Sequence, residues 1–211
     1  MREKLTGLYA ITDATQSDTQ QLIIDVEQAL LGGARIIQFR DKSNHSQQRL
    51  KTANELRKLT RQHNALFIIN DDVKLSKDSS ADGVHLGADD ASISAARAQL
   101  GPTAIIGVSC YNDFSLAKQA GNNGADYVAF GRFFPSLTKP HAIQANIEIL
   151  QTAKRELDTP IVAIGGITSK NGGELISAGA DMLAIVDDIF SQRDIKAAAL
   201  RYQKLFVEGL I

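Results

Sequence analysis

Short apolar runs alternate with longer amphipathic stretches along the chain. Most of the apolar runs are unbroken and rich in Val and Ile, which is typical of strands covered on both faces in a parallel sheet. Eight such runs are expected to be strands: residues 8–12, 35–39, 66–70, 83–86, 104–109, 127–131, 161–165 and 183–186.

The stretches between these runs show the periodicity of helices packed by one face. The first predicted helix ends at the paired glycines Gly32 and Gly33, and the last begins near Asp194. The apolar stripes are Leu22, Ile23, Val26, Ala29 and Leu30 in the first helix, Leu50, Ala53, Leu56 and Leu59 in the second, and Ile195, Ala198, Ala199, Leu205 and Phe206 in the last.

A weak internal repeat marks four of the junctions between a helix and the next strand. The segments "GGARIIQF", "SADGVHL", "NGADYVAF" and "AGADMLAI" each join a helix end, a small residue, a polar residue and a strand. About eight βα units in about 200 residues predict an α/β fold, a (β/α)₈ TIM barrel with parallel strands and outer helices. An open doubly wound sheet is the alternative. Because no linker or low-complexity stretch divides the chain, residues 1–211 are expected to form one domain.

Composition narrows the class of protein. The chain has 211 residues, 44% hydrophobic and 22% charged, with 23 Lys and Arg against 24 Asp and Glu. A net charge of -1 argues against a nucleic-acid partner bound through a broad basic surface. The lone cysteine, Cys110, favours a reducing compartment. The N-terminus lacks a signal-peptide pattern and no apolar run is long enough to span a membrane, so a cytoplasmic chain without a membrane partner is expected.

Polar residues follow the expected strands where each one ends. In a barrel of this type the active site lies at the carboxyl ends of the strands, so these residues should meet. Arg40, Lys42 and Lys139 supply cations, and Asp71 and Asp90 supply carboxylates from neighbouring strands. Carboxylates beside cations suit a polyphosphate carried by Mg²⁺. The glycine turn at Gly165 and Gly166 offers backbone N–H groups to a second phosphate.

Each of these residues also has a simpler structural interpretation. Arg40 could form an ion pair with Asp41 or Asp71 at the barrel rim. Asp71 or Asp72 could cap the helix that follows. His85 lies between two apolar residues, as a hydrogen-bonded core histidine would. Ser109 has no base near it in the sequence, so a nucleophilic role is weakly supported.

Seven segments together resemble the thiamine-phosphate synthase family. They are "YAITD", "QFRDK", "NDD", "GVHLGADD", "GVS", "DYVAFGRFFPSLTKP" and "VAIGGI", in this order from about Leu8 onward. The most specific parts are "QFRDK", the "ND" pair, Asp90 and the "TKP" loop. The resemblance implies a TIM barrel that joins hydroxymethylpyrimidine diphosphate to a thiazole phosphate, giving thiamine phosphate and diphosphate.

The resemblance also implies roles for individual residues. Asp71 and Asp90 would bind the cofactor, Mg²⁺. Arg40, Lys42, Ser109 and Lys139 would act in catalysis. The pyrimidine diphosphate would be bound by Gln38, Phe39, Arg40, Asp41, Lys42, Asn70, Ser109 and Lys139. The thiazole phosphate would be bound by Ser136, Leu137, Thr138, Gly166, Val186 and Asp187. A homodimer is the assembly that the resemblance implies.

The family's chemistry accounts for the residue types. The resemblance implies that diphosphate leaves the methylene carbon of the pyrimidine and that a cation stabilised by the pyrimidine ring forms. The protein then needs neither a strong base nor a nucleophile. It has to neutralise the leaving charge and hold the thiazole nitrogen close to the carbon.

Three positions depart from the family pattern. The family often has Gln at the position of Ala88 and His near the position of Tyr111, and it usually has a small or neutral residue at the position of Asp187. Asp187 could repel the phosphate, or it could point outward and cap the helix that follows. Two alternatives are a thiazole tautomerase-like paralogue, against which Asn70, Asp71 and Asp90 argue, and a non-catalytic protein that binds thiamine precursors. A third, a phosphate-binding isomerase, lacks an evident acid–base pair.

Overall fold

The computed structural model describes residues 4–13, 18–43, 45–135 and 143–208. Its eight parallel strands close into a barrel in chain order, and β1 pairs with β8 through Tyr9 and Ala184. The strands are β1 (Gly7–Ile11), β2 (Ile36–Phe39), β3 (Leu66–Asn70), β4 (Gly83–Leu86), β5 (Ile105–Tyr111), β6 (Tyr127–Phe130), β7 (Ile161–Ile164) and β8 (Met182–Ile185). The predicted (β/α)₈ barrel is confirmed, and the open-sheet alternative is wrong because the first and last strands are paired.

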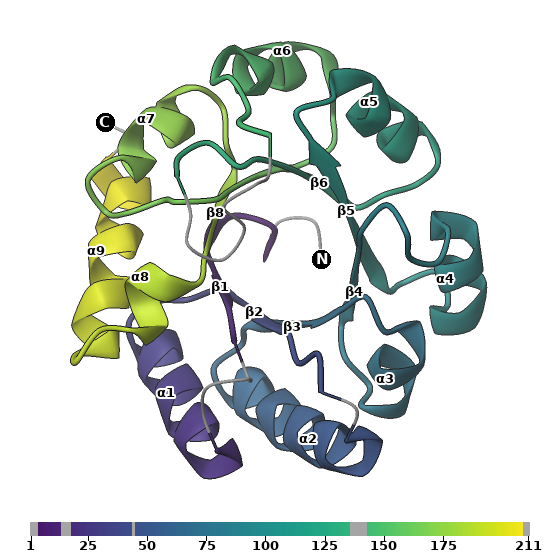
Figure 1. Ribbon diagram of the computed structural model, residues 1–211, viewed down its shortest axis with the longest axis vertical. Helices are drawn as coiled ribbons and strands as arrows, with labels where there is room; N and C mark the ends of the chain where they lie inside the picture. The colour runs from purple at the N-terminus through teal and green to yellow at the C-terminus, as the bar shows by residue number, and fades with distance from the viewer. Residues whose placement is uncertain (1–3, 14–17, 44, 136–142, 209–211) are drawn as a thin grey trace.

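Helices surround the strands as an outer ring (Figure 1). They are α1 (Thr19–Leu31), α2 (Ser46–Gln62), α3 (Val73–Asp78), α4 (Ile93–Leu100), α5 (Phe114–Asn122), α6 (Glu148–Glu156), α7 (Gly172–Ser177), α8 (Asp187–Phe190) and α9 (Ile195–Glu208). The predicted stripes face inward: Leu22, Val26 and Ala29 of α1 are buried, as are Ala198 and Ala199 of α9. The N–H of Gly32 bonds back to the carbonyl of Gln28, which ends α1 at the predicted glycines.

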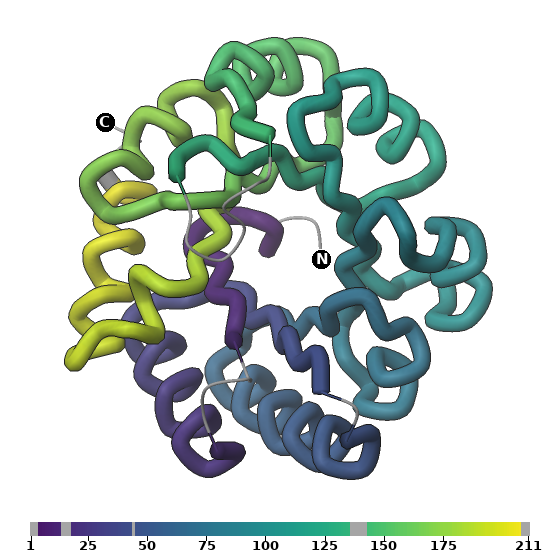
Figure 2. Tube along the Cα trace, in the orientation of Figure 1, coloured from purple at the N-terminus to yellow at the C-terminus, as the bar shows by residue number. Residues whose placement is uncertain are grey.

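Two layers of apolar side chains explain why the strands read as unbroken apolar runs. Residues that point inward fill the barrel, and among them are Tyr9, Ile36 and Tyr127. Residues that alternate with them point outward and pack under the helices. Leu5, ahead of β1, belongs to the inner layer and is 3% exposed. Residues 4–6, directly before β1, lie inside the ring of strands in this view of the trace (Figure 2).

The weak sequence repeat corresponds to a repeated ion pair at the amino ends of the strands. In three of the four repeats an aspartate precedes the strand: Asp82, Asp126 and Asp181. Each accepts a hydrogen bond from the first or second N–H of the preceding strand, namely Phe67, Ile106 and Ile161 at 2.8, 2.9 and 2.9 Å. Each also pairs with a helix cation: Arg57, Arg97 and Lys154. This end is opposite the expected active site, which indicates a role in stability.

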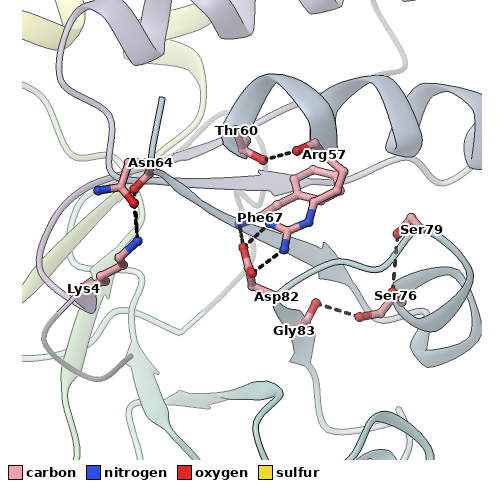
Figure 3. Close-up of polar contacts among 9 residues, drawn as sticks. All are labelled: Lys4, Arg57, Thr60, Asn64, Phe67, Ser76, Ser79, Asp82 and Gly83. Atoms are coloured by element: carbon pink, nitrogen blue, oxygen red, sulfur yellow. Dashed lines mark hydrogen bonds and ion pairs between the residues drawn. The ribbon is translucent and has the colours of Figure 1, made fainter. Parts of the chain in front are cut away.

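Figure 3 shows the first of these pairs. Arg57 reaches from α2 and donates from both terminal nitrogens to Asp82, at 2.5 and 2.6 Å, while Asp82 also accepts from the Phe67 N–H. The two side chains are only 13% and 17% exposed. A forked, largely buried pair of this kind is costly to break, because the partner left behind keeps its charge without compensation.

We expect Asp82→Ala to lower the free energy of unfolding by about 3 kcal/mol, since it strands the Arg57 guanidinium and the Phe67 N–H. Denaturant unfolding measures this loss. The matched control is Glu55→Ala, which removes an exposed pair with Lys58 and should leave stability close to wild type. Equal unfolding free energies for the two variants would contradict the structural role of Asp82.

Candidate active site

The barrel brings the predicted site residues to one end because all eight strands run in the same direction. Residues at or just after the strand ends are Gln38, Arg40 and Lys42 from β2, Asn70 and Asp71 from β3, Asp90 after β4, Ser109 from β5, Gly166 after β7, and Val186 and Asp187 after β8. Ser136, Leu137, Thr138 and Lys139, which the sequence also predicts for the site, lie outside the described residues.

The two aspartates of "NDD" have different environments. Asp72 accepts the N–H of Leu75 at 2.8 Å as the N-cap of α3, and its carboxylate lies 3.1 Å from Arg49. Asp71 has a positive φ of 63° and lies 3.5 Å from the Lys42 ammonium. The helix-cap interpretation therefore holds for Asp72, whereas the Asp71 carboxylate lies beside Lys42.

Asp71 and Asp90 form an acidic pair at the ends of neighbouring strands. Burial raises the pKa of Asp71, the nearby Asp90 carboxyl raises it further, and Lys42 opposes the shift. Asp90 is oriented by the N–H of Gly87, which donates to its carboxylate at 2.6 Å. Two carboxylates held together at an energetic cost are the arrangement that a divalent cation relieves.

The two carboxylates suit Mg²⁺ better than they suit a metal ion that takes all of its ligands from the protein. Among the residues that the structure describes, no three His, Cys, Asp or Glu side chains come together as a metal site. Mg²⁺ is commonly held by one or two carboxylates together with substrate phosphates and water. Asp71 and Asp90 supply that minimum, and the hard oxygen donors do not suit a soft metal.

The two cations of "QFRDK", Arg40 and Lys42, have different ion-pair partners from those that the sequence suggested. Arg40 approaches Asp13 at 4.0 Å rather than Asp41 or Asp71, and its side chain is 23% exposed. Lys42 is the partner of Asp71. Asp41 accepts the N–H of Ser43 at 2.7 Å and so shapes the turn after β2. Among the described residues, the ion pairs of these two cations are long, at 4.0 and 3.5 Å, so neither cation is held in a tight pair there.

Phe39 differs from the other residues predicted to bind the pyrimidine diphosphate. It alternates with Gln38 along β2, and its side chain is buried in the layer between strands and helices. Its side chain therefore points away from the barrel interior, where Gln38 points.

A chain of hydrogen bonds crosses the barrel beneath these polar residues. Gln38 Nε2 donates to the Tyr9 hydroxyl at 2.7 Å, which lies 2.8 Å from the Tyr127 hydroxyl. Tyr127 in turn meets His85 Nδ1 at 2.9 Å, and His85 Nε2 lies 2.9 Å from Ser109 Oγ. Five strands thus contribute to one network, and it fixes the side chains of Gln38 and Ser109 at opposite ends.

Sequence reasoning missed most of this network. His85 is hydrogen-bonded on both ring nitrogens, as the core interpretation expects, but its contact with Ser109 could not be found from the sequence because the two side chains meet across β4 and β5. Strand periodicity could have pointed to Tyr9 and Tyr127, because a tyrosine inside a barrel needs a partner for its hydroxyl. Gly107 makes the space: a Cβ there would lie 1.9 Å from the Tyr127 ring.

The connections after β6 and β7 pack against each other. The N–H groups of Phe133 and Phe134 bond to the carbonyls of Ile164 and Gly165 at 3.2 and 3.0 Å. Gly166 adopts φ +64°, and a Cβ there would lie 2.3 Å from the carbonyl oxygen of Pro135. The glycine turn is therefore required by the close approach of the two connections.

The structure after β8 does not place Asp187 at the N-cap position of the next helix. The short helix α8 begins at Asp187 itself, Val186 occupies the N-cap position, and no side chain caps the helix there. Asp187 is exposed, whereas the next residue, Asp188, is partly buried. Asp187 is therefore the first residue of α8 and not its cap.

The family model described as "Thiamine monophosphate synthase" matches residues 8–189. The chain belongs to this family. It is 50% identical over 206 residues to the thiamine-phosphate synthase of Nitrosococcus oceani, covering 98% of this chain and 95% of the relative. It is 48% identical over 206 residues to that of Thiobacillus denitrificans, covering 98% and 97%. The solved thiamine phosphate pyrophosphorylase of Pyrococcus furiosus matches with a TM-score of 0.88 at 35% identity, covering 100% of this chain and 99% of that one.

Membership of the thiamine monophosphate synthase family confirms the family named from the sequence motifs, and with it the prediction of a transferase. The coverage is nearly complete for both the chain and its relatives, so the likeness concerns the whole barrel. Within the described residues, no helix is long and apolar enough to cross a membrane.

Proposed function

We propose that this chain joins hydroxymethylpyrimidine diphosphate to thiazole phosphate, forming thiamine phosphate and releasing diphosphate. The observation that carries the proposal is the acidic pair Asp71 and Asp90 beside Lys42, at adjoining strand ends of a barrel from this family. Arg40 follows the neighbouring strand β2 at the same end of the barrel. Two thiamine-phosphate synthases at 50% and 48% identity support the choice of reaction.

Asp71 and Asp90 would hold Mg²⁺, which when bound supplies positive charge to the leaving diphosphate. Arg40 and Lys42 would contact the diphosphate directly, with Asn70 and Ser109 as hydrogen-bonding partners. Lys139, outside the described residues, would add a further cation. Electrostatic catalysis depends mainly on charged groups that are already in position before the reaction begins.

The pyrimidine would lie above the hydrogen-bonded chain that crosses the barrel. Gln38 and Ser109 stand at the two ends of that chain, and their fixed orientation supports their role as ligands. Held side chains lose little freedom when a ligand binds, which favours affinity.

The thiazole phosphate would be bound on the opposite side of the barrel mouth. Gly166, Val186 and Asp187 would contribute there, the last through its backbone N–H, because its carboxylate would repel the phosphate. Ser136, Leu137 and Thr138, outside the described residues, would complete the site.

In this reaction the bond from the methylene carbon to the diphosphate oxygen breaks, and its electron pair leaves with the diphosphate. The thiazole nitrogen then donates its lone pair to the carbon. No proton has to move at the reacting atoms, so the cations and the close placement of the two substrates carry the catalysis.

The direct test mixes both substrates with Mg²⁺ and measures thiamine phosphate and diphosphate. Equal amounts of the two products support the proposal. Folded protein that binds the precursors without turnover would favour the non-catalytic alternative. Isomerisation of a thiazole carboxylate without joining would favour the tautomerase-like paralogue.

Three further predictions remain proposals. We propose one domain over residues 1–211, a homodimer as the family resemblance implies, and a cytoplasmic location. The single cysteine supports a reducing compartment, and burial raises the pKa of the Cys110 thiol to about 12, which keeps it unreactive.

Asp187→Ser tests whether the carboxylate opposes the thiazole phosphate. Because the side chain is exposed, solvent screens it, and the Michaelis constant for thiazole phosphate should change by less than about threefold. The constant for the pyrimidine diphosphate should not change. A decrease of about tenfold or more for thiazole phosphate would show that the carboxylate faces the phosphate.

A further inference from the structure

The tyrosine hydroxyl of Tyr202, in the last helix, lies between the two connections proposed to bind the thiazole phosphate. It donates to the Asp188 carboxylate at 2.5 Å and lies 3.3 Å from the carbonyl oxygen of Ile167. Asp188 belongs to α8, directly after β8, and Ile167 follows β7. Both partners are one residue away from a proposed phosphate ligand, Asp187 in one connection and Gly166 in the other.

The hydroxyl is not needed to fill space. Tyr202 is completely buried, and its ring belongs to the apolar layer between strands and helices. A phenylalanine would fill the same volume without bringing a polar group out of water. The two acceptors, Asp188 and Ile167, therefore offset the cost of burying the hydroxyl. Burial and the Asp188 carboxylate raise the pKa of Tyr202, so the hydroxyl keeps its proton and remains a donor.

Each connection is also held from a second direction. The carbonyl of Gly166 accepts from Asn171 Nδ2 at 3.2 Å, so the backbone from Gly166 to Ile167 is fixed at two consecutive carbonyls. On the other connection Ile189 is fully buried beside Asp188. α9 packs against both α7 and α8, so Tyr202 approaches the two connections from the helical layer (Figure 1).

We propose that Tyr202 is a positioning residue: through Asp188 and Ile167 it sets the spacing of the β7 and β8 connections and thereby the affinity for the phosphate group of the thiazole substrate. The inference rests on the proposed function, because that function places a phosphate between these connections. Tyr202 itself touches neither substrate. Its effect concerns a phosphate that does not react, so it should appear in binding rather than in the chemical step.

Tyr202→Phe is the primary test because it removes one oxygen and keeps the ring. We expect the Michaelis constant for thiazole phosphate to rise about tenfold, as misplaced binding groups commonly cause. The turnover number and the constant for the pyrimidine diphosphate should stay within about twofold. Asp188→Ala should change the constant in the same direction but by less, because Tyr202 keeps the Ile167 carbonyl as an acceptor. The double variant should be no worse than Tyr202→Phe alone, since that variant already removes both contacts.

Calorimetry separates a positioning role from a merely structural one. Tyr202→Phe should weaken the binding of thiazole phosphate and leave the binding of the unphosphorylated thiazole alcohol unchanged. The matched control is Ser79→Ala, which removes another buried hydroxyl, bonded to the Leu75 carbonyl at 2.7 Å in α3. It should lower stability without changing either affinity.

If Tyr202→Phe and Asp188→Ala lower only the melting temperature, as Ser79→Ala does, the positioning role is wrong. A wild-type protein that binds thiazole phosphate but forms no product would reject the proposed reaction, and the calorimetric comparison would still decide the role of Tyr202. A wild-type protein that does not bind thiazole phosphate at all would overturn both. Should Tyr202→Phe fail to fold, Asp188→Ala carries the comparison, with Asp188→Asn as its control, because the amide oxygen can still accept from Tyr202 and the affinity for thiazole phosphate should stay close to wild type.

Discussion

Asp90→Asn is expected to lose about two to three orders of magnitude in turnover with Mg²⁺ while its metal-free form stays at least as stable as wild type. The loss follows from removing one of two carboxylates proposed to hold the ion, because metal charge is worth several kcal/mol to a developing diphosphate anion. Asn can still accept from the Gly87 N–H through its amide oxygen, so the local fold should persist.

The effect on stability has a definite sign. The pKa of Asp71 is raised in the folded protein by burial first and by Asp90 second. Ionisation of Asp71 therefore costs stability at neutral pH, and this cost disappears as the pH falls through its folded pKa. Removing the Asp90 charge relieves part of the cost, so the metal-free variant should melt at the same temperature as wild type or higher.

Two measurements check this prediction: initial rates against Mg²⁺ concentration, and melting temperatures with EDTA and with Mg²⁺ plus pyrimidine diphosphate. Wild type should gain stability from the ion and the substrate, and Asp90→Asn should not. Asp71→Asn is a second variant with the same expectation, and asparagine tolerates the positive φ at this position. Full activity of the wild type in EDTA would show that the reaction does not need the metal ion.

The sequence could predict the barrel because its strands are apolar on both faces and the βα unit recurs. It could also predict where the site lies, since the ends of parallel strands must meet. It placed Asp71 in the site but left open whether Asp71 or Asp72 caps the next helix, because only the backbone at the end of β3 shows which one does. The helix after β8 begins one residue earlier than the cap interpretation of Asp187 required.

The interior network was harder to predict for a different reason. Tyr9 and Tyr127 are 118 residues apart, and their hydroxyls meet only because the closed barrel places both rings in its interior. His85 and Ser109 meet because β4 and β5 are neighbours in a particular register, in which His85 is opposite Gly107. Periodicity indicates which residues point inward, but the contacts between them depend on register and on the space left by small residues.

Arg40→Ala is expected to reduce kcat/KM by about a hundredfold or more while leaving the fold intact. Arg40 follows β2 at the mouth of the barrel, and the ion pair described for it is a loose one with Asp13 at 4.0 Å. A guanidinium that binds a diphosphate through charged hydrogen bonds contributes a few kcal/mol to the transition state. A rim ion pair of that geometry contributes at most about 1 kcal/mol to stability.

Two companion variants separate these roles. Arg40→Lys keeps the charge but loses the forked donor geometry, so its activity should lie between Arg40→Ala and wild type. Asp13→Ala removes the acidic partner and leaves the guanidinium, so it should keep most of the activity if Arg40 is a ligand. Steady-state kinetics with the pyrimidine diphosphate varied, together with a melting curve for each variant, supplies the comparison. If Arg40→Ala turned over within a few-fold of wild type, or if Asp13→Ala matched its loss, Arg40 would serve the ion pair rather than the leaving diphosphate.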